Sequence, residues 1–102
     1  MKVYWTDFAK QSLKEVYHFY RKNASEKVAK RIKAQIFFKT KLLEQQSKVG
    51  QIEPFLEEIG LDHRYILSGN FKIIYLIQGE SIFITDLFDT RQNPEKINDP
   101  TR

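Results

Sequence analysis

Four side chains between His63 and Pro94 are suited to phosphate chemistry: His63, Tyr65, Lys72 and Arg91. Cleavage of RNA by its own 2′-hydroxyl needs a base for that proton, an acid for the leaving 5′ oxygen and cations for the phosphorane. A histidine with a pKa of about 6.5 can serve as the acid or the base. Lys72 and Arg91 could hold the phosphate, with Arg91 as the bidentate contact, and Tyr65 could stack on a base. These residue types are therefore chemically sufficient for RNA cleavage without a metal.

Each of these side chains also has a structural interpretation. A lone histidine beside Arg64 is more often a surface residue, and Tyr65 can be a strand packing residue. Lys72 can protect the edge of a sheet from unwanted pairing. Arg64 and Asp86 are predicted to lie on the helix-facing side, where a pair between them would be structural. The set alone is therefore weak evidence for an enzyme.

The same segment predicts three short antiparallel strands joined by two tight turns. Gly69-Asn70 and Gly79-Glu80 each suit a two-residue hairpin turn, because glycine relieves the positive φ that such turns need. Alternation from these turns sorts the side chains onto two faces. The first face is predicted to carry Ile66, Ile73, Tyr75, Ile77, Ile82, Ile84 and Phe88. The second is predicted to carry His63, Tyr65, Leu67, Lys72, Ile74, Leu76, Phe83, Thr85 and Leu87, and Arg91 keeps the same parity. A slip of one residue would exchange these assignments.

The second face is predicted to be a partner-binding surface. Leu76, Phe83 and Leu87 lie on it, and nothing else in the chain is an obvious cover for them. A large apolar patch rimmed by charge is typical of a protein-binding surface. The alternative is that the linker 49–62, with Leu56 among its anchors, folds across this face.

The first half of the chain predicts a strand and an antiparallel pair of helices. Residues 2–5 are β-prone, and Thr6 suits the N-cap of a helix whose apolar residues recur at steps of three and four. Asn23 and Glu26 resemble a weak capping box before a second helix, and the short connection at 22–25 makes the two helices a hairpin. The predicted fold class is α+β, with an N-terminal strand and an antiparallel helical hairpin packed on one face of a small, mainly antiparallel sheet.

The charge is distributed unevenly along the chain. Residues 1–48 carry 12 Lys or Arg and 4 Asp or Glu, a net charge of +8, whereas residues 49–102 carry 5 and 9, a net charge of −4. This basic helical half, which includes Lys30 and Arg31, predicts contact with a polyanion or with an acidic protein segment. The alternative is a lysine-rich helix face that is simply solvated.

The length of 102 residues predicts a single domain over 1–102, with 97–102 as a flexible tail. No apolar run approaches the roughly 20 residues that span a bilayer, and the N-terminus lacks a signal-peptide core. The chain has no cysteine, and its two histidines are isolated from each other. We therefore expect a cytoplasmic protein with no membrane contact, no metal site and no other cofactor.

The order of the predicted elements resembles the RelE/ParE superfamily of toxins from type II toxin–antitoxin systems. Ser68–Tyr75, SGNFKIIY, is similar to the family's glycine–aromatic–basic–apolar–apolar–tyrosine strand. Asp89–Pro94, DTRQNP, is similar to the arginine-bearing end of the family's last strand, and Arg64-Tyr65-Ile66 fits the strand before. The resemblance covers nearly the whole chain and depends on the order and spacing of short motifs.

The resemblance implies two activities on one fold. RelE-like members cut messenger RNA in the ribosomal decoding site, whereas ParE-like members poison DNA gyrase. Lys72 and Arg91 match the family's contacts to the scissile phosphate. His63 and Tyr65 stand where RelE-like members have two catalytic lysines, and Ile97 stands near the place of an expected tyrosine. The implied partners are a cognate antitoxin and either the ribosome with its messenger RNA or DNA gyrase.

Three functions stay open. The first is a ribosome-dependent, metal-independent messenger RNA endonuclease, in which the catalytic residues are Lys72, Arg91 and His63 and the substrate-binding residues are Tyr65, Arg64, Lys30 and Arg31. The second is a non-enzymatic gyrase inhibitor, and the third is a stand-alone nucleic-acid-binding module. The two phosphate-contacting cations favour the first function, which is our prediction, while the missing lysines and tyrosine favour the second. The basic helical half is neutral among the three.

Overall fold

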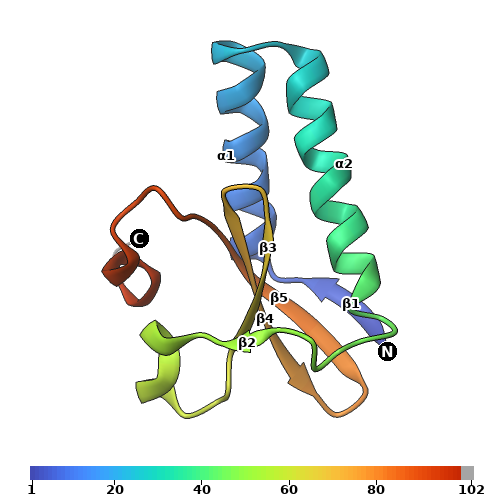
Figure 1. The fold of residues 1–102 in the computed structure, drawn as a ribbon, viewed down its shortest axis with the longest axis vertical. Coiled ribbons are helices and arrows are strands. Elements are labelled where there is room, and N and C mark those ends of the chain that lie inside the picture. Colours follow the sequence, from blue (N-terminus) through green and yellow to red (C-terminus); the bar gives the residue numbers. More distant parts are fainter. Residues whose placement is uncertain (100–102) are drawn as a thin grey trace.

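The structure, a computed structural model, describes residues 1–99. The elements follow the order β1 (Lys2–Trp5), α1 (Asp7–Asn23), α2 (Glu26–Leu42), β2 (Gln51–Ile52), η1 (Pro54–Ile59), β3 (Arg64–Ser68), β4 (Phe71–Gln78), β5 (Ser81–Asp89) and η2 (Pro94–Asn98), where η marks a 3-10 helix. In Figure 1 the two helices stand side by side and project beyond the sheet. The predicted α+β fold class is confirmed. None of the helices in residues 1–99 is long and apolar enough to cross a membrane.

Side-chain caps set where the two helices begin. The Thr6 hydroxyl accepts a hydrogen bond from the Ala9 N–H at 3.1 Å, as predicted for the N-cap of α1. The N-cap of α2 is Ser25, whose hydroxyl accepts from the Val28 N–H at 3.1 Å. The predicted capping box of Asn23 is therefore wrong, because the Asn23 amide donates back to the Phe19 carbonyl at the end of α1.

The five strands form one sheet in the order β1-β5-β4-β3-β2. β1 runs parallel to β5, and the other pairs are antiparallel. Both predicted hairpin turns are present, with Gly69 at φ 56° and Gly79 at φ 60°. Ser68 pairs with Phe71 and Gln78 pairs with Ser81, so the register next to each turn is the predicted one.

A β-bulge in β5 changes the face assignment beyond the turns. Ile74 pairs with Asp86 but Tyr75 pairs with Ile84, so Thr85 is an extra residue on its strand. Every side chain of β5 after Thr85 therefore points to the face opposite to the one that simple alternation predicts. Leu87 lies in the core beneath the helices and Phe88 lies on the other face, which corrects the predicted positions of both.

Each face of the sheet has its own apolar cluster. The larger cluster lies between the sheet and the helical hairpin and includes Ala9, Leu13, Ile36, Leu43, Phe71, Ile73, Tyr75, Ile82, Ile84 and Leu87. The smaller cluster on the opposite face consists of Leu56, Ile74, Phe88 and Ile97, with Tyr65 against it. Leu56 belongs to η1 and Ile97 to η2, so the linker does fold across this part of the second face. Ile97, the first residue of the predicted tail, is 8% exposed, while residues 100–102 lie outside the described part of the chain.

Candidate functional site

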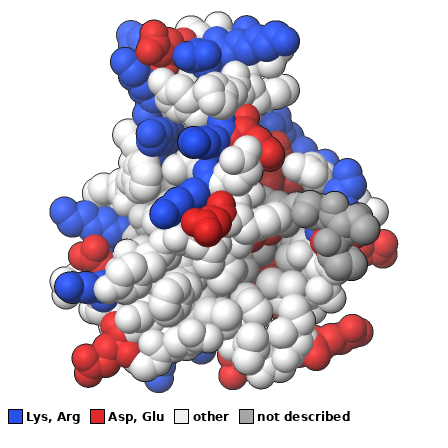
Figure 2. Space-filling model, turned by 180° about the vertical axis from the view of Figure 1, so that it is seen from behind, with Lys and Arg blue, Asp and Glu red and all other residues white. Residues whose placement is uncertain are grey.

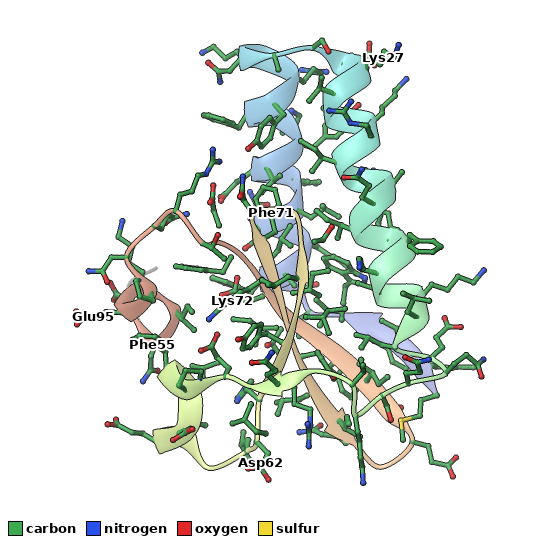
Figure 3. All side chains as sticks on the ribbon, viewed as in Figure 1. Lys27, Phe55, Asp62, Phe71, Lys72 and Glu95 are labelled. Carbon is green, nitrogen blue, oxygen red and sulfur yellow. The ribbon has the colours of Figure 1, made fainter. Side chains whose placement is uncertain are left out.

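Lys72 is held in a buried ion pair with Glu53. The Lys72 ammonium lies 2.7 Å from a Glu53 carboxylate oxygen, and the Glu53 side chain is fully buried. Glu53 also caps η1, because its other oxygen accepts from the Phe55 N–H at 3.1 Å and Pro54 opens the helix. The ammonium lies 4.3 Å from the centre of the Tyr65 ring, a cation–π contact. Figure 3 shows Lys72 on the side of the sheet that carries η1, whereas its neighbour Phe71 lies by the helices.

His63 belongs to the same group of residues. Its carbonyl accepts from the Glu53 N–H at 2.7 Å, and its side chain is buried, with no hydrogen-bond partner for Nδ1 among residues 1–99. Burial lowers the pKa of His63, and the nearby Glu53 carboxylate opposes that shift in part. Three of the four predicted site residues, His63, Tyr65 and Lys72, are thus brought together around Glu53, which the sequence analysis did not single out.

Arg91 lies on the helix-facing side, just beyond β5. Its guanidinium is 2.6 Å from the Asp89 carboxylate and donates a 2.9 Å hydrogen bond to the Tyr20 hydroxyl of α1. The hydrogen bond from Arg91 lowers the pKa of Asp89, and the carboxylate raises the pKa of Arg91. A hollow of about 390 Å³ adjoins this pair, and Phe71 and Leu87 are in its wall.

The two predicted phosphate contacts do not converge. Lys72 pairs across the strands with Phe88, which lies on the η1 face, whereas Phe71 pairs with Asp89, the partner of Arg91 on the helix face. The bulge at Thr85 is the physical reason, because it reverses the parity that placed Arg91 with Lys72. Each cation is also already paired with a carboxylate. The two cations thus face opposite sides of the sheet, and their joint contact to a phosphate stays a prediction.

The other predicted substrate-binding residues lie elsewhere. The Arg64 guanidinium donates to the Gly50 carbonyl at 2.8 Å and to the Lys48 carbonyl at 3.4 Å, so it holds the loop after α2. Lys30 forms an exposed pair with Glu26 at 3.5 Å within α2. Arg31 lines a separate surface hollow along α2. Their substrate-binding role stays a prediction.

The predicted partner surface is smaller than expected. Leu76 is 8% exposed and Leu87 is 3% exposed, so neither offers much surface to a partner. Phe83 is half-buried, and its ring stacks on that of Tyr4 at 5.6 Å between centroids. The physical reasons are the bulge, which turns Leu87 inward, and β1, which brings Tyr4 against Phe83.

A second hollow, which we call the aromatic pocket, was missed by the sequence analysis. Its volume is about 410 Å³, and it is lined by Val3, Tyr4, Trp5, Lys10, Leu13, Lys14, Tyr17, His18, Lys33 and Phe37. These residues come from β1, α1 and α2, which follow one another along the chain. The signal in the sequence was the aromatic residues of the two helices that lie outside the regular apolar spacing. Only the tertiary structure brings these residues close to β1.

Comparison with known proteins places the chain in a family. The family model described as "ParE toxin of type II toxin-antitoxin system, parDE" matches residues 3–94. A solved structure described as "Chromosomal ParDE TA system from P. aeruginosa" is similar in fold, with a TM-score of 0.73 and 22% identity over 87% of this chain and 95% of that chain. No curated protein matches the chain.

This chain belongs to the ParE toxin family of type II toxin–antitoxin systems. The predicted resemblance to the RelE/ParE superfamily is thereby confirmed. Membership of a type II system implies a cognate antitoxin protein as partner.

Proposed function

We propose that this toxin inhibits growth by binding DNA gyrase rather than by cutting messenger RNA. The observation that carries the proposal is the separation of Lys72 from Arg91 on opposite faces of the sheet. Membership of the ParE family, rather than a RelE-like one, supports the same proposal. The ribonuclease that the sequence analysis favoured needs both cations on one phosphate.

The electrostatics of Lys72 and His63 support a non-catalytic role. A cation stabilises a developing phosphorane only if it can approach it without first leaving a stronger partner. Lys72 would have to leave a fully buried carboxylate, and an unpaired charge there is costly. His63 is buried with a lowered pKa, so near neutral pH it is poorly suited to donate a proton to a leaving oxygen.

The antitoxin is the second part of the proposal. In Figure 2 Lys and Arg gather mainly on the helical hairpin at the top of the molecule, while most Asp and Glu lie lower down. We propose that the antitoxin covers part of this basic half with an acidic, amphipathic segment. Apolar burial would supply most of the affinity, and the charge would speed the encounter.

The test compares gyrase inhibition with RNA cleavage in the same cells and with the purified chain. Gyrase inhibition predicts intact transcripts, accumulated DNA breaks and blocked supercoiling in vitro. RNA cleavage predicts translation-dependent cuts that are lost in Arg91→Ala, by about 10²–10³-fold if one charge-stabilising contact is removed. Lys96→Ala, which removes an exposed cation from η2, is the matched control. Translation-dependent cuts together with normal supercoiling would overturn the gyrase proposal.

A further inference from the structure

An exposed apolar patch lies on the outer side of α2, next to β3. We call it the outer patch, and it consists of Phe38, Leu42, Val49 and Leu67, which are 64%, 43%, 57% and 52% exposed. Leu42 follows Phe38 by one turn of α2, so the two side chains are neighbours on the helix surface. Leu42 also lines a hollow of about 290 Å³ together with Val49 and Leu67. The four side chains are therefore contiguous, and a contiguous exposed patch is typical of a binding surface.

The outer patch has a basic rim. Arg31 and Lys39 line a hollow of about 560 Å³ beside Phe38, and Lys39 also lines the hollow of Leu42. Among residues 1–99 no carboxylate lines either hollow, and Arg31 and Lys39 form no ion pair. Residues 27–43 hold six Lys or Arg and no Asp or Glu. The patch is therefore complementary to an apolar surface that carries carboxylates at its margin.

The composition of the patch favours a protein over a nucleic acid as its partner. Protein interfaces are enriched in aromatic side chains and Arg, and here Phe38 and Arg31 line the same hollow. The other three side chains of the patch are aliphatic and make no hydrogen bond to a phosphate. A second copy of this chain fits less well, because a two-fold contact would bring Arg31 and Lys39 near the same cations of the other copy. A different, acidic protein is therefore the expected occupant.

We propose that the outer patch is the surface with which this toxin binds an acidic site with an apolar centre on DNA gyrase. The inference deepens the proposed function and rests on it for the identity of the partner. Phe38 is the central contact, because it is the most exposed large apolar side chain among residues 1–99. Arg31 and Lys39 speed the encounter through their charge and face carboxylates of gyrase at the rim.

The test measures binding to purified gyrase and inhibition of supercoiling, both with the full chain. Phe38→Ala with Leu67→Ala should weaken binding at least about tenfold and raise the inhibitory concentration in proportion. The matched control is Phe19→Ala with Leu61→Ala, which removes one Phe and one Leu that are 55% and 53% exposed outside the patch. The control should change binding by less than about twofold. Equal affinity of the two double variants for gyrase would overturn the inference.

A second pair of variants tests the basic rim and leaves the apolar side chains in place. Arg31→Glu with Lys39→Glu should weaken gyrase binding at least about tenfold, and added salt should then weaken it less than in the wild type. The same charge change at Lys10 and Lys14, which line the aromatic pocket, should have a much smaller effect. Equal affinity within this pair would also overturn the inference, whether or not the apolar double variant folds.

The outcomes separate this inference from the proposed function. If the wild-type chain does not inhibit gyrase, both fail; if the wild type and both patch variants inhibit it equally, the inference alone fails. The same variants are tested for binding to the purified antitoxin encoded by the adjacent reading frame, to DNA without gyrase, and to the chain itself. Loss of any of these contacts with gyrase binding intact would assign the outer patch to that occupant and overturn the inference.

Discussion

Replacement of Lys72 by methionine tests whether this residue holds the fold together. Methionine keeps most of the aliphatic stem, so the main loss is the charge that faces Glu53 across 2.7 Å. The Glu53 side chain is fully buried and that of Lys72 is 16% exposed, so solvent cannot easily replace the lost cation. Breaking a buried pair by removing one partner costs about 3–5 kcal/mol. That cost is a large share of the roughly 5–15 kcal/mol that stabilises a typical domain.

The assay is urea unfolding followed by circular dichroism. Lys72→Met should lower the free energy of unfolding by about 3–5 kcal/mol, and adding Glu53→Gln should recover most of it, because the amide needs no cation and can still cap η1. Lys96→Met, at an exposed site in η2, is the control and should change stability by less than about 0.5 kcal/mol. A loss below about 1 kcal/mol in Lys72→Met, or no recovery in the double variant, would refute the structural role. Loss of toxicity in Lys72 variants is therefore interpretable only beside their stability.

Three further predictions concern the loop after α2 and the buried histidine. Tyr75→Phe should cost about 2–3 kcal/mol in urea unfolding, because the Tyr75 hydroxyl accepts from the Gly50 N–H at 2.9 Å and donates to the Ser47 carbonyl at 2.8 Å; wild-type stability in this variant would contradict the account. Gly50→Ala should destabilise by more than about 1 kcal/mol, since a Cβ there would lie 2.5 Å from the Tyr75 hydroxyl and 2.8 Å from a backbone carbonyl. The lowered pKa of His63 means that the unfolded chain takes up a proton more readily, so unfolding free energy should fall as pH drops below about 6.5 and level off below the folded-state pKa. His63→Gln should flatten that slope between pH 7 and pH 5, and an unchanged slope would exclude His63 as its source.

The elements of the fold were predictable because their signals are local. The Thr6 cap lies within a few residues of the bonds it makes, and the same holds for the turns at Gly69 and Gly79. The sequence also allows the linker to cover the second face, and the packing of Leu56 confirms this alternative in part.

The site was not predictable because it depends on long-range pairing. Strict alternation missed the extra residue Thr85, whose only trace in the sequence is the three-residue step from Ile84 to Leu87 in an otherwise regular strand. Glu53 lies 19 residues before Lys72, and no periodic pattern connects a linker acid to a strand lysine. The aromatic pocket likewise depends on how β1 docks beside the helices.

The bulge has a consequence for how such a chain can change over evolutionary time. Loss of the codon for Thr85 would move the later side chains of β5 to the opposite face, exchanging the places of Leu87 and Phe88 and turning Arg91 toward the side of Lys72. A point mutation cannot make that change, since it alters one side chain and leaves the count of residues in the strand intact. Insertion or deletion of a single codon in this strand could thus bring both cations to one face of the sheet or separate them again. Each such step would also require the positions of Leu87 and Phe88 to repack.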